Sequence, residues 1–253
     1  MVHGYGVAAL KPVFADLNLR LNVKDSDATL RILKDVSALG YTLVGVSFEA
    51  KTQADEVERL KGACSEIGVD LVSRVDLKPR GSSDLMHQLR SLRRKFELVC
   101  VICENKAVAR QAAKDRRVDL LSFPFLDFRR RFFDRAEAEL ARTGLAALEI
   151  DAKPLLVLDG PARVRLLSSL QREVSIARSF GVPVVISSGV SRRLLLRKPR
   201  EMAALGFLFG LDEHSGLNAV SQNPVTIVER NREKMSTGFV APGIRVVKEG
   251  LDC

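Results

Sequence analysis

Residues 145–189 read LAALEIDAKPLLVLDGPARVRLLSSLQREVSIARSFGVPVVISSG. Two short runs in this stretch, residues 145–150 and 182–187, are almost continuously apolar, which is typical of parallel strands that are buried on both faces. Between them, apolar side chains recur at helical spacing from 162 to 180, and Gly181 follows as a residue suited to end a helix. The stretch therefore predicts a strand, a crossover helix and a second strand of one parallel sheet.

The same alternation of strand and helix runs along the whole chain. The other strand candidates are residues 13–19, 41–48, 69–75, 98–103 and 118–123, and we expect a weaker eighth strand between 205 and 220. Helical stripes of apolar residues also occupy 53–68 and 84–96. Eight β/α units in about 250 residues match a parallel (β/α)8 barrel, whereas an open doubly wound sheet usually has five or six strands. The pattern predicts an α/β fold of the TIM-barrel class.

The chain shows no sign of a division into domains. Low-complexity tracts and repeats beyond the β/α alternation are absent, so we expect residues 1–253 to form one domain, with 235–253 as a tail lying on the barrel. Gly40, Gly68, Gly144 and Gly181 each stand where a helix should end in a left-handed residue. No run approaches the ~20 apolar residues of a membrane span, and the 4 cysteines are too few for a disulfide framework. These features predict a cytoplasmic protein.

Positive charge is the unusual feature of the composition. Lys and Arg number 40 against 31 Asp and Glu, a net charge of +9, which favours an acidic partner such as nucleic acid. The excess is clumped, with five cations and no acid in residues 192–200 and three consecutive arginines at 129–131. Arginine engages phosphate with two parallel hydrogen bonds, although any single cluster is equally consistent with a solvated surface.

The residues available for catalysis are less informative. Carboxylates such as Glu149 and Asp151 follow predicted strands, but the chain has only 3 histidines to complete a zinc-type site. His3 and His87 lie away from strand ends, and a lone His214 is more often structural than a metal ligand. Cys100 and Cys103 stand an odd number of residues apart on one strand, so they point to opposite faces and are interpreted as small buried hydrophobic residues.

Seven short motifs occur in an order that resembles a known family. They are FADLNL at 14–19, GY at 40–41, SRVDL at 73–77, VDLLSFP at 118–124, ALEI at 147–150, VISSG at 185–189, and NP at 223–224 followed by RNREK at 230–234. Together they resemble the TIM-barrel protein component of archaeal and eukaryotic ribonuclease P, which is called protein component 3 in archaea. The resemblance covers residues from about 12 to 234.

This resemblance implies a barrel similar to polymerase-and-histidinol-phosphatase enzymes that has lost its hydrolytic metal site. Active relatives of that barrel carry Asp-x-His-x-His on the first strand, where this chain has Asp16, Asn18 and Arg20. An amide is a poor metal ligand and a guanidinium is not a ligand, so these three are interpreted as degenerate metal-site positions. We therefore expect no catalytic residue, no bound metal and no cofactor in the chain itself.

The resemblance also implies a function and partners. In ribonuclease P the RNA is the catalyst, which uses Mg²⁺ to remove the 5′ leader from precursor tRNA, and the family protein supports it. The implied partners are the ribonuclease P RNA, precursor tRNA indirectly, and a small ferredoxin-like protein subunit in a heterotetramer, with no membrane. The isolated chain should be inactive.

On this interpretation clustered cations neutralise RNA phosphates, which makes assembly strongly dependent on salt. The predicted RNA contacts are Arg74, Arg93, Arg94, Arg129, Arg130, Arg192, Arg193, Arg197, Lys198 and Arg200. The alternative is a free-standing, metal-dependent phosphoesterase on the same barrel, which the carboxylates at strand ends would favour.

Overall fold

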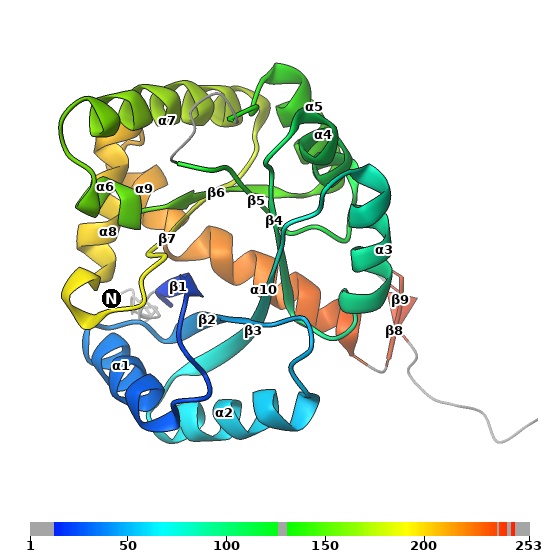
Figure 1. Ribbon diagram of the computed structural model, residues 1–253, viewed down its shortest axis with the longest axis vertical. Coiled ribbons are helices and arrows are strands. Elements are labelled where there is room, and N and C mark those ends of the chain that lie inside the picture. The colour runs from blue at the N-terminus through cyan, green and yellow to red at the C-terminus, as the bar shows by residue number, and fades with distance from the viewer. Residues whose placement is uncertain (1–12, 126–130, 237, 242–243, 246–253) are drawn as a thin grey trace, which may run out of the picture.

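A computed structural model describes residues 13–125, 131–236, 238–241 and 244–245 of the chain. Seven parallel strands follow one another in sequence order around a nearly closed barrel, and helices surround it (Figure 1). The strands are β1 (Ala15–Leu19), β2 (Leu43–Phe48), β3 (Asp70–Leu77), β4 (Leu98–Ile102), β5 (Leu120–Ser122), β6 (Ala147–Asp151) and β7 (Val184–Ser187). This architecture confirms the prediction of a TIM barrel.

Helices connect the strands and then close the chain. The helices between strands are α1 (Ser26–Ala38), α2 (Ala54–Glu66), α3 (Ser82–Leu92), α4 (Lys106–Lys114), α5 (Arg135–Gly144), α6 (Lys153–Val157) and α7 (Gly160–Phe180). After β7 come η2 (Arg193–Leu195), α8 (Pro199–Leu205), η3 (Gly206–Phe209), α9 (Glu213–Ala219) and α10 (Gln222–Met235). The part of the chain that the structure describes contains no helix long and apolar enough to cross a membrane.

The predicted eighth strand is wrong, because residues 205–220 form η3 and α9 instead. An apolar run of this length cannot be assigned to strand or helix by periodicity alone. Gly216 also favours the helical packing, since a Cβ there would lie 2.7 Å from the Ala203 carbonyl oxygen. The gap between β7 and β1 is bridged by single backbone hydrogen bonds, from Gly189 to Asn18 and from Arg20 to Val190, both of 3.0 Å.

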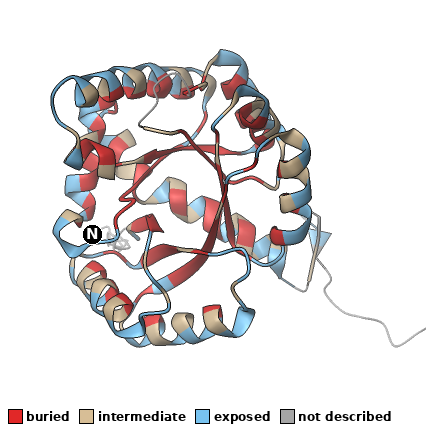
Figure 2. Cartoon of the chain, in the orientation of Figure 1, coloured by how far each residue is buried: buried red, intermediate tan, exposed pale blue. Residues whose placement is uncertain are grey.

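Two separate layers of apolar side chains form the core. One lies between the strands and the outer helices, and the other fills the interior of the barrel with residues such as Leu17, Val72 and Leu98. Ile227 and Val228 of α10 join this inner layer, so α10 closes the amino end of the barrel, which it crosses in Figure 1. Figure 2 shows that burial is concentrated on the strands and on the helix faces turned toward them.

The ends of α1, α2, α5 and α7 test the predicted glycine stops. Gly40, Gly68 and Gly181 have the expected positive φ, but after α5 the left-handed residue is Leu145, at φ 63°. Gly144 is needed for a different reason: a Cβ there would lie 2.1 Å from the Ala113 carbonyl oxygen. The glycine therefore permits close packing of α5 on α4, and the following leucine adopts the left-handed conformation.

The predicted tail is partly described. Its described residues are 235–236, 238–241 and 244–245, which include two short antiparallel strands, β8 (Phe239–Ala241) and β9 (Ile244–Arg245), and β8 contacts α10. Residues 246–253 lie outside the described part of the chain.

Candidate functional site

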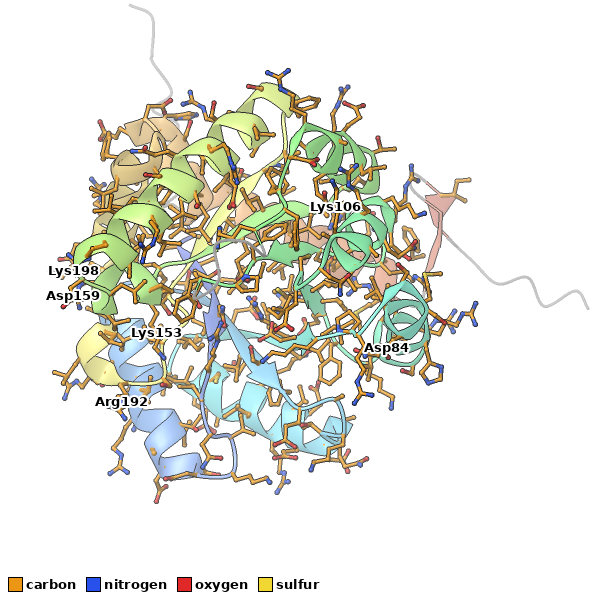
Figure 3. All side chains as sticks on the ribbon, turned by 45° about the horizontal axis from the view of Figure 1, so that its top comes forward. Asp84, Lys106, Lys153, Asp159, Arg192 and Lys198 are labelled. Atoms are coloured by element: carbon orange, nitrogen blue, oxygen red, sulfur yellow. The ribbon has the colours of Figure 1, made fainter. Side chains whose placement is uncertain are left out.

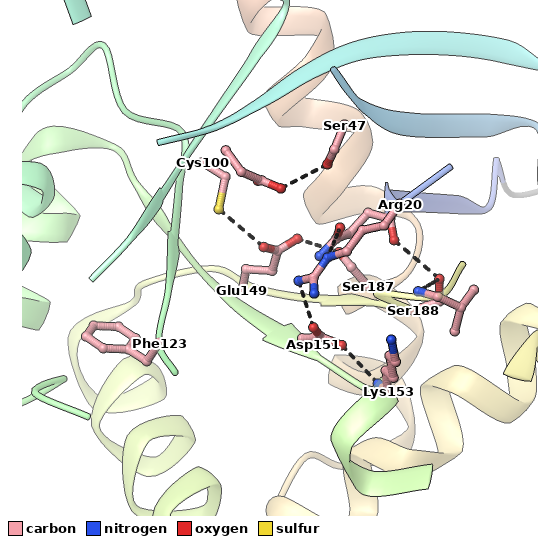
Figure 4. A network of polar contacts seen from close by, with 12 residues as sticks. Arg20, Ser47, Cys100, Phe123, Glu149, Asp151, Lys153, Ser187 and Ser188 are labelled. Carbon is pink, nitrogen blue, oxygen red and sulfur yellow. Dashed lines mark hydrogen bonds and ion pairs between the residues drawn. The ribbon is translucent and has the colours of Figure 1, made fainter. Parts of the chain in front are cut away.

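A buried arginine occupies the interior of the barrel near the carboxyl ends of the strands. Arg74 on β3 donates two parallel hydrogen bonds to the carboxylate of Glu149 on β6, the longer one of 2.7 Å from Nη2 to Oε2. Its Nε atom donates to Asp76 Oδ1 at 2.8 Å, and Nη1 also donates to the Leu17 carbonyl oxygen at 2.8 Å. Figure 4 shows Glu149 at the centre of this network. The Ser187 hydroxyl also donates to Glu149 Oε1, at 2.8 Å.

The prediction that Arg74 contacts RNA is wrong, because its side chain is 0% exposed. Val72 and Arg74 are two residues apart on one strand and therefore face the same way, which is into the barrel. Burial by itself would lower the pKa of the Arg74 guanidinium, but the carboxylates of Asp76 and Glu149 raise the pKa well above its ordinary value. Burial likewise opposes ionisation of Asp76, yet Arg74 and Ser47 hold the pKa of Asp76 below its ordinary value. Arg74 is thus the permanent counter-ion of the interior carboxylates.

A cavity of about 510 Å³, lined by both charged and apolar side chains, opens at this end of the barrel, which is called the mouth below. Arg20 spans its rim and forms an ion pair of 2.9 Å with Asp151, whose other oxygen accepts from the Lys153 backbone nitrogen. Burial raises the pKa of Asp151 to about 6, and Arg20 opposes that shift. Gly189, at φ 64°, leaves the space that this carboxylate fills, since a Cβ would lie 2.0 Å from Asp151 Oδ1.

The three degenerate metal-site positions do not converge on one point. Asp16 and Asn18 are buried at the seam between β1 and the segment after β7, where Asp16 Oδ1 accepts from the Ser188 backbone nitrogen at 2.9 Å. Burial raises the pKa of Asp16, and the hydrogen bonds from Ser188 oppose that rise. Arg20 extends instead to the cavity, with a contact of 3.4 Å to Asn18 Oδ1 on the way.

Glu149, Asp76 and Asp151 at the mouth are each paired with an arginine. Among the described residues, no group of three or more His, Cys, Asp or Glu side chains is arranged to hold a metal ion. His87 on α3 and His214 on α9 are exposed, and His214 contacts Asn218 at 3.0 Å.

Cys100 lies in the inner core and Cys103 in the outer layer, which confirms that they point to opposite faces. Burial raises the pKa of both thiols well above its ordinary value, so neither is a reactive thiolate.

The basic segment after β7 lies on the rim of the mouth and divides into two groups. Arg193 forms an exposed ion pair of 2.9 Å with Asp35, and Arg197 donates to the carbonyl oxygens of its own loop. Arg192, Lys198 and Arg200 are exposed and form no ion pair with the described residues. Figure 3 places Arg192 and Lys198 on the same side of the molecule as Lys153. Arg192, Lys198 and Arg200 are called the rim cations below.

The remaining predicted contacts are divided among different places. Arg93 is only 14% exposed and bonds to Asp119 at 3.1 Å, at the amino end of the barrel, while its neighbour Arg94 is exposed. Arg129 and Arg130 lie outside the described residues. Arg131, the next in that run, is buried in an ion pair with Glu173 on α7 and donates to the Phe123 carbonyl oxygen. Apart from Arg74, the predicted RNA contacts stay predictions.

Comparison with known proteins identifies the family. The family model for RNase P subunit p30 matches residues 13–236. Ribonuclease P protein component 3 of Methanosarcina barkeri is 33% identical over 242 residues, which cover 95% of this chain and 98% of the relative. The chain belongs to the RNase P subunit p30 family. A further member, component 3 of Methanosarcina mazei, is 30% identical over 96% of this chain and 98% of its own length.

Solved structures agree with this fold. A chain in the cryo-EM structure of archaeal ribonuclease P with mature tRNA superposes with a TM-score of 0.78 at 22% identity, covering 93% of this chain and 98% of that chain. A prolidase complexed with N-methylphosphonate-L-proline gives a lower TM-score of 0.53 at 13% identity, over 92% of this chain and 78% of the prolidase. Both likenesses concern the fold alone, and they show a p30-family chain with the general barrel architecture.

Sequence reasoning missed the pairing of the cations. Arg74 and Glu149 are 75 residues apart, and only their shared inward register on β3 and β6 brings them together. Strand alternation was the available signal, because Arg74 is two residues from Val72 and Glu149 two from Ala147. At the amino end of the barrel, Arg230 and Arg232 of α10 pair with Asp119, Asp70 and Glu97, and these pairs could not be assigned before the position of α10 was known.

Proposed function

We propose that this chain is an RNA-binding protein subunit of ribonuclease P that supports the catalytic RNA in removing the 5′ leader of precursor tRNA. The observation that carries the proposal is the family match, which extends over nearly the whole length of component 3 relatives. A part in RNA binding is further supported by the rim cations Arg192, Lys198 and Arg200, which project from the barrel without an ion pair among the described residues.

The chemistry of the mouth fits a supporting part better than a hydrolytic one. Glu149 and Asp76 are saturated by Arg74, and Asp151 is paired with Arg20, so a metal ion would have to displace two guanidinium groups. Carboxylates held this way cannot act as free general bases toward a phosphodiester. We therefore assign Mg²⁺ to the RNA of the holoenzyme and no cofactor to this chain.

The partners in this proposal are the ribonuclease P RNA, precursor tRNA through that RNA, and a small ferredoxin-like protein subunit. We propose that the two proteins assemble as a heterotetramer in the cytoplasm. Light scattering of the mixed proteins tests the stoichiometry, and a mass other than two copies of each would replace it.

Reconstitution tests the function directly. The purified chain is added to a ribonuclease P RNA with the other protein subunits, and cleavage of precursor tRNA is measured at limiting Mg²⁺. We expect the chain to increase the cleavage rate, and an unchanged rate would contradict the proposal. Phosphate release by the protein and a divalent metal alone would instead support the phosphoesterase alternative.

Two double variants, one on the rim and one as its control, test whether the rim cations bind RNA. Arg192→Ala with Arg200→Ala removes two exposed, unpaired charges, and Arg31→Ala with Arg59→Ala removes two exposed charges from α1 and α2. We expect the first pair to weaken RNA binding and to reduce its salt dependence, because fewer counterions are released. The second pair should leave both quantities near the wild-type values, and an equal effect of the two pairs would exclude a specific rim surface.

A further inference from the structure

The amino end of the barrel, opposite the mouth, carries a second group of cations. Arg93 follows α3, Arg116 lies in the loop between α4 and β5, and Arg230 and Lys234 belong to α10, which closes this end. These four residues are named here the amino-end cluster: Arg93 and Arg230 pair with the carboxylate of Asp119 just before β5, Arg116 precedes Asp119 in the same loop, and Lys234 lies one helical turn after Arg230. The chain segments that supply them are separated by up to 141 positions, from Arg93 to Lys234, and the fold brings them together.

Both oxygens of the Asp119 carboxylate already accept hydrogen bonds from arginines. Asp119 is 0% exposed, and its two oxygens accept from Arg93 and Arg230, each at 3.1 Å. Oδ2 also accepts from the Val99 backbone nitrogen at 2.8 Å. Arg116 and Lys234 form no ion pair with any residue in the described ranges. Arg93 and Arg230 therefore share the charge of Asp119, and Arg116 and Lys234 have no paired carboxylate among the described residues.

This arrangement has an electrostatic cost in the free protein. Burial lowers the pKa of the Lys234 ammonium, and the nearby charges of Arg230, Arg93 and Arg116 lower the pKa further, with Asp119 opposing them. Like charges gathered in this way destabilise a folded chain unless an anion compensates them. Arg93 and Arg230 hold Asp119 and backbone carbonyl oxygens, but neither Arg116 nor Lys234 makes a comparable contact among the described residues.

We propose that the amino-end cluster is a second RNA-binding surface. Arg116 and Lys234 bind the phosphodiester backbone, while Arg93 and Arg230 are held by their ion pairs with Asp119. This inference rests on the proposed function and adds the location of a second contact. An arginine and an ammonium without internal partners provide donors for phosphate oxygens at the surface. No base-reading residue is invoked, so binding at this surface is independent of sequence.

The position of the cluster has a consequence for assembly. The rim cations follow the carboxyl end of β7, whereas the amino-end cluster surrounds the starts of β4, β5 and β6. The two surfaces therefore lie at opposite ends of the barrel. One chain can hold two RNA segments, which suits a subunit that supports the folded form of a large RNA.

The test uses the full chain and two double variants. Arg116→Gln with Lys234→Gln removes the unpaired charges of the cluster, and Arg31→Gln with Arg59→Gln is the matched control on α1 and α2. Affinity for a short RNA duplex is measured over a range of salt concentrations, and thermal stability is measured alongside. We expect the cluster variant to lower the slope of log affinity against log salt by roughly 1–2, given ~0.9 per phosphate contact.

The melting temperature distinguishes an RNA-binding role of Arg116 and Lys234 from a purely structural role. Cations near helix ends can also stabilise the helix dipole, and removing them would then lower the melting temperature. If Arg116 and Lys234 serve RNA, their removal relieves like-charge repulsion, so the cluster variant should melt at or above the wild-type temperature while it binds RNA less tightly. A lower melting temperature with an unchanged salt slope would overturn the proposal.

Two further outcomes distinguish failure of the second surface from failure of the proposed function. If the wild-type chain binds and the rim variant loses affinity, but the cluster variant matches its control, the second surface is refuted and the proposed function stands. If the wild-type chain binds no RNA, both are refuted. Loss of binding to phosphatidylserine vesicles, with RNA affinity unchanged, would assign the cluster to a membrane surface and overturn the RNA proposal.

Discussion

Replacing Arg74 by methionine should be among the most damaging single substitutions in this barrel. The guanidinium and the Glu149 carboxylate are both 0% exposed, and they are joined by two parallel hydrogen bonds. Arg74→Met leaves Glu149 charged in the barrel interior and leaves the Leu17 carbonyl oxygen without that donor. Breaking one side of a buried ion pair typically lowers the free energy of unfolding by about 3–5 kcal/mol. For a domain of this size that corresponds to a fall of roughly 6–20 °C in melting temperature.

Urea unfolding followed by far-UV circular dichroism is the appropriate assay, because the chain has no Trp and only 2 Tyr to report by fluorescence. A second variant separates loss of charge compensation from loss of packing. Arg74→Met with Glu149→Met removes the fully buried pair and leaves Asp76, which is partly exposed and still accepts from Ser47, so the double variant should recover a large part of the stability that Arg74→Met loses, since apolar replacement of a buried pair is often neutral.

Two results would refute this reasoning. A loss below about 1 kcal/mol in Arg74→Met would mean that the pair is solvated, as exposed ion pairs are. If the double variant loses as much stability as Arg74→Met and Glu149→Met lose together, the two side chains act independently, and Arg74 then acts through packing and the Leu17 contact rather than through Glu149. RNA affinity, measured where Arg74→Met is fully folded, should equal that of the wild type because Arg74 is buried.

Three further predictions concern individual positions. Burial raises the pKa of Glu137 to about 7, so the folded chain keeps a proton that the unfolded chain has released, and stability falls as the pH rises from about 4.5 to that value. Glu137→Gln removes this titration, and its stability relative to the wild type should rise by about 3 kcal/mol across that interval; a constant difference in urea unfolding would contradict it. Leu145→Gly should stabilise the chain by about 0.5–1 kcal/mol, because Leu145 adopts φ 63°, and no gain in melting temperature would show that the conformation is unstrained. Gly144→Ala should destabilise by about 1–3 kcal/mol through the clash with the Ala113 carbonyl oxygen, whereas a neutral effect would mean that α4 and α5 separate easily.

The barrel could be predicted because its strands carry a local signal. Continuous apolar runs such as 182–187, each followed or preceded by a helical stripe, are characteristic of parallel strands whatever surrounds them. The run at 205–209 has the same composition but forms the end of α8 and then η3, because Gly206 and Gly216 allow close helix packing. Local hydrophobicity cannot distinguish these cases, since the deciding contacts come from residues elsewhere in the chain.

The candidate site was less predictable for a related reason. A basic residue is read from the sequence without its partner, and the partner decides whether the charge is available to a ligand. Arg74 is the one cation of its strand and Arg131 ends a run of three arginines, yet each is buried against a carboxylate, of Glu149 and of Glu173 respectively. Arg192 and Arg200, which have the same chemistry, are exposed and have no such partner among the described residues.

The distribution of paired and unpaired arginines also explains how one barrel can be both stable and strongly basic. Arg74, Arg93 and Arg131 compensate buried carboxylates, so their charges are neutralised inside the protein and contribute little to the external field. The net charge of +9 is therefore expressed largely by exposed residues, which include the rim cations at one end and Arg116 at the other. Because charge at both ends acts on phosphate through counterion release, removing the rim pair and the cluster pair together should reduce the salt slope by the sum of their separate effects. A combined loss equal to either one alone would mean that a single RNA segment contacts both ends, and the model of two segments on one chain would then fail.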